Sequence, residues 1–82
     1  MNNSFYNDFA ARFAASTLPS LVRSFNSQVG KRGFTSVRAA HDKALIDELV
    51  RRDIDVSAVY DGTATSYAHH VELDNNRLVI KK

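Results

Sequence analysis

Apolar residues recur every third or fourth position through the first half of the chain, which is the period of an α-helix. Phe5, Phe9 and Phe13 follow this spacing and predict a first helix capped by Asn3 or Ser4. It should end before Leu18-Pro19, because the residue before a proline is pushed out of the helical conformation, while the proline itself fits the first turn of a new helix. We therefore expect a second helix from this point to Gly30, a residue that favours helix ends.

The helical period resumes after Thr35 and Ser36, either of which can cap a third helix that runs to about Arg52. The apolar positions change face within this helix. Those in residues 37–44 group together, whereas those in residues 45–50 are rotated away from them. The first part is therefore expected to pack on the other two helices and the second part on a sheet.

After residue 53 apolar and polar residues alternate, which is the pattern of a β-strand. Asp61-Gly62 and Asn75-Asn76 are two-residue hairpin signals, because these residue types accept the positive φ angles of such turns. Both turns place the same apolar set on one face of a sheet. They pair Tyr60 with Thr63, Ala58 with Thr65, Val56 with Tyr67, Ile54 with His69, Leu73 with Leu78 and Val71 with Ile80.

The combined pattern predicts an α+β fold. Three N-terminal helices are followed by a three-stranded antiparallel β-meander, and the helices pack on one face of the sheet. The chain is expected to form a single small domain over residues 1–82, with a helical part in 1–52 and the β-meander in 54–82.

Composition narrows the classes of function. At 82 residues and 9.2 kDa the core is thin and leaves little room for a cofactor pocket, so no cofactor is expected. The absence of cysteine excludes disulfide scaffolds, cysteine-based zinc sites and thiol nucleophiles. Apolar runs are only a few residues long, so we expect no membrane partner and a cytoplasmic location.

The net charge of +2 hides an uneven distribution. Residues 1–40 hold five basic residues and one acid, whereas residues 41–61 hold three basic residues and six acids. No acid lies between Asp8 and Asp42. This stretch can bind a polyanion or an acidic protein surface, because it holds no acid that would offset its positive charge.

Two surfaces are candidates for binding. The first is a basic turn followed by the amino end of the third helix, where free backbone amides favour a phosphate or carboxylate; a solvated connector is the alternative. Its residues are Lys31, Arg32, Gly33, Thr35, Ser36 and Arg38. The second is the outer sheet face around His70, Glu72, Arg77 and Lys81. Open edges of the outer strands also allow a homodimer through the sheet.

The histidines do not predict a metal site. His69 and His70 are adjacent in a strand and point to opposite faces, while His41 is expected to be a hydrogen-bonded core residue. A small ribonuclease would use His70 as general base, with Arg77 and Lys81 stabilising phosphate charge.

We therefore expect a small binding or regulatory module that acts by contact with a protein or a polyanionic partner, and not an enzyme. The alternative is a DNA- or RNA-binding regulator that uses the basic turn and the amino end of the third helix. A metal-independent ribonuclease is the second alternative.

Overall fold

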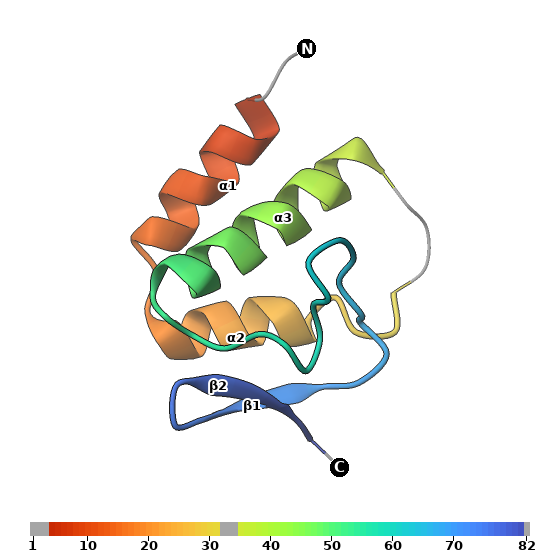
Figure 1. Ribbon diagram of the computed structural model, residues 1–82. Helices are drawn as coiled ribbons and strands as arrows, with labels where there is room; N and C mark the ends of the chain where they lie inside the picture. Colours follow the sequence, from red (N-terminus) through yellow and green to blue (C-terminus); the bar gives the residue numbers. More distant parts are fainter. Residues whose placement is uncertain (1–3, 32–34, 82) are drawn as a thin grey trace.

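The fold is α+β, as the sequence predicts. The computed structural model describes residues 4–31 and 35–81. In order, the elements are α1 (Ser4–Ala14), α2 (Leu18–Asn26), α3 (Ser36–Arg51), β1 (Val71–Asp74) and β2 (Arg77–Ile80) (Figure 1). The two strands form an antiparallel hairpin. None of these helices is long and apolar enough to cross a membrane.

The second helix begins where the proline rule places it. The Thr17 hydroxyl caps α2 by accepting a hydrogen bond from the Ser20 N–H at 3.3 Å, and Pro19 occupies the first turn. The helix ends earlier than expected, at Asn26, and turns follow up to Gly30, which has a φ of 79°.

The third helix matches its predicted bounds closely. The Thr35 hydroxyl caps it by accepting from the Arg38 N–H at 3.0 Å. At its carboxyl end Asp53 adopts a φ of 61°, and the Ile54 N–H donates to the Leu49 carbonyl at 3.0 Å. Leu49 and Ile54 are both buried, which completes a Schellman-type helix end with aspartate where glycine is usual.

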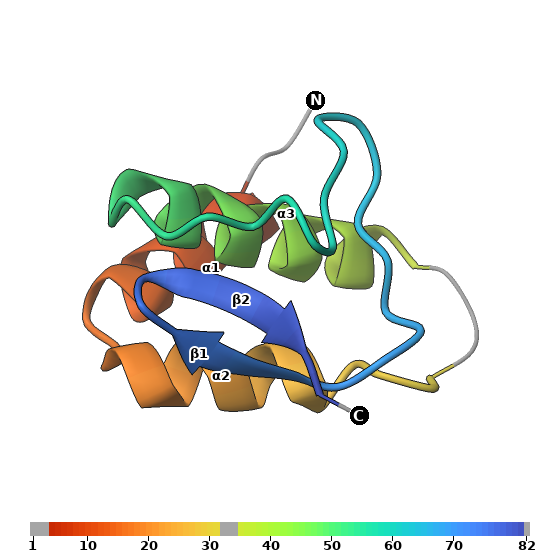
Figure 2. The same cartoon turned by 60° about the horizontal axis from the view of Figure 1, so that its bottom comes forward.

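Packing around α3 forms the core. The α1 helix lies against α3, where the rings of Phe9 and Phe13 meet the His41 imidazole edge-on with centroids 5.1 and 5.3 Å apart. The α2 helix packs on both α3 and β1, which runs alongside it (Figure 2). The largest fully buried side chains lie at the centre: Phe25, Leu21, Leu45, Leu49, Leu78 and Val71.

The Asn75-Asn76 hairpin has the predicted register. Val71 faces Ile80 and Leu73 faces Leu78, and the two asparagines adopt φ angles of 49° and 64°. Turn chemistry and strand alternation point to the same pairing, so the local prediction is confirmed.

The predicted three-stranded meander is wrong, because residues 54–60 do not form a strand. The Asp55 carboxylate accepts from the Ser57 N–H at 2.8 Å and so starts a turn. The Val59 and Tyr60 N–H groups then both donate to the Val56 carbonyl, at 3.0 and 2.9 Å. This turn buries Val56 and Val59, three residues apart, whereas strict alternation would turn Val59 outward.

The turn at Asp61-Gly62 is also longer than predicted. The Asp61 carboxylate accepts from the N–H groups of Thr63 and Ala64, each at 2.8 Å, and closes a four-residue loop. Tyr60 therefore pairs with Thr65 and not with Thr63. Only this bridge remains of the predicted pairing, and the chain from residue 60 to 67 lies beside α3.

Candidate functional site

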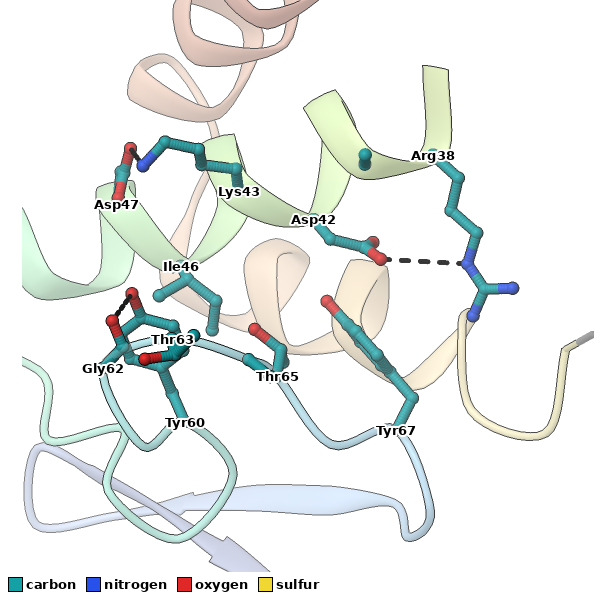
Figure 3. Close-up of a pocket in the computed structure, with 12 residues that line it drawn as sticks. Arg38, Asp42, Lys43, Ile46, Asp47, Tyr60, Gly62, Thr63, Thr65 and Tyr67 are labelled. Atoms are coloured by element: carbon teal, nitrogen blue, oxygen red, sulfur yellow. Dashed lines mark hydrogen bonds and ion pairs between the residues drawn. The ribbon is translucent and has the colours of Figure 1, made fainter. Parts of the chain in front are cut away.

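A groove lies between α3 and residues 60–67 (Figure 3). Its volume is about 810 Å³, within the range of binding sites for small molecules and peptide side chains. Ile46 forms an apolar floor, and Tyr60, Thr65 and Tyr67 line the opposite wall. The groove is the candidate functional site.

The helical wall of the groove carries charges in pairs. Arg38, Asp42, Lys43 and Asp47 share this side of α3, because residues three and four apart lie on one helix face. The Arg38 Nε lies 3.7 Å from an Asp42 oxygen, and the Lys43 Nζ lies 3.3 Å from an Asp47 oxygen. The wall therefore presents both signs of charge and no net charge.

Asp47 also anchors α1 to this wall. The Tyr6 hydroxyl donates a hydrogen bond to the Asp47 carboxylate, which raises the pKa of Tyr6 above its usual value, with burial as a second cause. The Lys43 ammonium lies 6.0 Å from the centre of the Tyr6 ring. Contacts from both sides thus fix the carboxylate in position.

Tyr67 forms the other end of the groove. Its ring stacks on Phe25 with centroids 4.5 Å apart, and the Arg38 guanidinium lies 5.9 Å from the ring centre. Its hydroxyl oxygen is buried and has no hydrogen-bond partner among the described residues. Burial raises the pKa of Tyr67 far above its usual value, and the nearby Asp42 carboxylate adds to this without reaching hydrogen-bonding geometry.

The loop of residues 61–64 holds the remaining wall in place. The Tyr60 hydroxyl donates to the Gly62 carbonyl at 3.0 Å, and Gly62 adopts a φ of 98° that favours glycine. Together with the Asp61 cap, this bond positions Thr63 and Thr65 along the groove.

Two of the four described residues of the predicted basic turn make contacts inside the fold. The Arg38 guanidinium donates to the carbonyls of Gln28 and Lys31, at 3.3 and 3.2 Å, besides its pair with Asp42. The Thr35 hydroxyl serves as the helix cap. Lys31 and Ser36 are exposed, whereas Arg32 and Gly33 lie outside the described residues.

The residues of the second predicted surface are all exposed, but they do not form one group. The Lys81 N–H donates to the His70 carbonyl at 2.8 Å, so these two residues face each other. Arg77 lies beside the turn, within 3.9 Å of Asp74, and about 13 Å along the strand from Lys81. Glu72 lies between them, opposite Val79.

Other segments cover part of each sheet edge. The Asn26 side chain accepts from the Val71 N–H and donates to its carbonyl, at 2.8 and 2.9 Å, on the edge of β1. On β2 the Leu78 N–H donates to the Asp55 carbonyl at 2.9 Å. Strand alternation leaves outward-facing backbone groups at Leu73 and Ile80. Few backbone groups at the sheet edges are therefore left to pair with a strand of a second copy.

His41 is the hydrogen-bonded core residue that its position predicts. Its Nδ1 lies 3.1 Å from an Asp42 oxygen, and its ring is largely covered by the two phenylalanines. Among the described residues, no three potential ligands are grouped as a metal ion requires.

The groove itself has no local signature in the sequence. Tyr60 and Tyr67 can be expected to lie inward from their alternation, but the wall that faces them comes from a helix more than a dozen residues away. Two aspartates could have predicted the turns of this segment, namely Asp55 and Asp61. An aspartate two residues before a serine or threonine favours a capped turn over a strand.

Comparison of the chain with models of protein families, with curated proteins and with solved structures finds no match.

Proposed function

We propose that this protein is a non-catalytic binding module that holds a peptide segment of a protein partner in the groove between α3 and residues 60–67. The observation that carries the proposal is the lining of the groove. An apolar floor at Ile46 lies between two tyrosine rings and two fixed ion pairs. Apolar surface for side chains, with a few placed polar groups, is typical of sites that bind by contact.

The polar groups favour a peptide over a phosphate chain. Asp42 and Asp47 each pair with a cation of the helical wall, so the wall has no excess positive charge to attract a phosphate. A peptide backbone is uncharged and carries both donors and acceptors. One of its carbonyls can accept a hydrogen bond from the Tyr67 hydroxyl once that side chain turns toward the ligand.

The state of the titratable groups supports binding over catalysis. Arg38 and Lys43 are each paired with a carboxylate, so their charges stabilise the wall. The raised pKa of Tyr67 moves its titration away from neutral pH, where a general acid or base must exchange protons. The protein would then regulate its partner only by holding the partner's peptide segment in the groove.

Selection from a displayed random peptide library tests the proposal. A selected peptide is then synthesised with a fluorescent label and titrated with the protein. Thr65→Arg places a long cationic side chain in the groove and should weaken binding by about tenfold or more. Ala11→Arg adds the same charge on the exposed side of α1 and should leave affinity within about twofold.

Unchanged thermal unfolding of both variants shows that the fold is intact. If Thr65→Arg and Ala11→Arg bind the peptide equally well, the groove is not the binding site.

A further inference from the structure

Two parts of the chain that are distant in sequence meet where α2 ends. The Gly30 N–H donates to the Tyr67 carbonyl at 3.4 Å, and the Asn26 side chain holds both backbone groups of Val71. Residues 27–31 therefore lie beside residues 67–71, as both cartoon views show (Figures 1 and 2).

The end of β2 joins the same place, because the Lys81 N–H donates to the His70 carbonyl at 2.8 Å. Three exposed basic or imidazole side chains thus project from adjoining backbone. They are Lys31, His70 and Lys81, and we call this surface the basic end. The basic turn and the sheet-face candidates, which are separate in the sequence, contribute to it together.

Arg38 offsets partial negative charge of backbone carbonyls beside this surface. The carbonyls that follow a helix carry partial negative charge and disfavour anions. Here the Arg38 guanidinium donates to the carbonyls of Gln28 and Lys31, which offsets that charge. Glu72, two residues from His70, is the carboxylate that remains exposed beside the basic end.

We propose that the basic end binds single-stranded nucleic acid. The two ammonium groups would contact phosphates, and the exposed imidazole ring of His70 offers a flat surface on which an unpaired base stacks. A duplex keeps its bases stacked inside, where an exposed imidazole cannot stack on them. The basic end adjoins the groove but shares none of its lining side chains, and the proposal does not depend on the proposed function.

Fluorescence anisotropy with a labelled single-stranded oligouridine tests the proposal. Two phosphate contacts predict that affinity falls by about sevenfold between about 50 and 200 mM salt. Lys81→Glu should weaken binding by about tenfold, through loss of one contact and gain of repulsion. Arg77→Glu makes the same charge change at the other end of the hairpin and should weaken it by less than about threefold.

Three results would overturn the proposal. The first is the absence of binding at low salt, where the electrostatic attraction is strongest. The second is equal weakening by Lys81→Glu and Arg77→Glu. The third is equal or tighter binding of duplex DNA or of polyglutamate, which would assign the basic end to a duplex or to an acidic protein surface. None of these results bears on peptide binding in the groove.

Discussion

At the scale of single residues, Glu48 and Arg52 connect the first helix to the third. The Glu48 side chain is only 5% exposed, yet it is ionised between Arg51 and Arg52. Arg52 also donates to the carbonyls of Phe13 and Ser16, at 2.9 and 2.7 Å, and so caps the end of α1. The sequence shows the spacing of this pair but not its burial, because burial comes from α1.

The two arginines provide a matched comparison. Arg52→Gln removes the cap on α1 and one partner of a buried carboxylate, and should lower the free energy of unfolding by about 2 kcal/mol. The Arg51 side chain is 64% exposed, so Arg51→Gln should have a clearly smaller effect. Urea unfolding measures both, and equal losses would show that the contacts to α1 contribute nothing.

Tyr67→Phe separates stability from binding. The hydroxyl is buried and the described residues offer it no hydrogen-bond partner, so its removal should leave the free energy of unfolding unchanged or raise it by about 1 kcal/mol. Affinity for a groove-selected peptide should fall, because the proposal has this hydroxyl donate to a ligand carbonyl once the side chain turns toward the peptide. A loss of stability with unchanged affinity would mean that the hydroxyl has a structural partner and no role in binding.

At the scale of elements, prediction succeeds where local signals agree. The Asn75-Asn76 hairpin has its expected register because turn residues and alternation favour the same pairing. Residues 54–66 depart from it because the Asp55 and Asp61 carboxylates cap neighbouring N–H groups and close turns instead. The alternation of apolar and polar residues does not show that an aspartate side chain can bond these N–H groups in place of a neighbouring strand.

The carboxyl end of α3 offers a test at this scale. Asp53 adopts a φ of 61°, which L-residues reach at a cost of about 1 kcal/mol or more. Asp53→Gly should therefore raise the free energy of unfolding by about 0.5 to 1 kcal/mol. Asp53→Ala should lower it, since alanine tolerates this conformation less well than aspartate. The opposite order in thermal unfolding would contradict the helix-end geometry.

At the scale of the whole molecule, the candidate site is a product of tertiary structure. The sequence predicts the third helix and the inward tyrosines, but the groove exists only because residues 60–67 lie beside α3. The same holds for the basic end, where residue 30 bonds to residue 67 and residue 81 bonds to residue 70. The distribution of charge along the sequence identifies the basic residues. It does not show that the Arg38 guanidinium is bonded to backbone carbonyls.

The whole molecule should be most stable between about pH 5 and pH 10. Hydrogen bonds from Arg51, and from the backbone at Ser57 and Ala64, lower the pKa values of Glu48, Asp55 and Asp61 below their ordinary 4.5, 3.8 and 3.8. The unfolded chain therefore takes up protons first, and stability falls as the pH drops through this range. Burial raises the pKa of Tyr67 above 10.0, so stability also falls above that pH, where the unfolded chain loses its proton first.

Unfolding in urea across this pH range measures the effect. Glu48→Gln should flatten the acid side and Tyr67→Phe the alkaline side. A pH dependence that neither variant changes would contradict the placement of these two groups.

The most direct test of the central proposal is nuclear magnetic resonance of the ¹⁵N-labelled protein, titrated with a library-selected peptide. If the groove binds the peptide, the backbone amides of residues 38–47 and 60–67 should shift together and saturate at one affinity. Shifts confined to the outer face of the hairpin or to α2, with residues 60–67 unchanged, would contradict it.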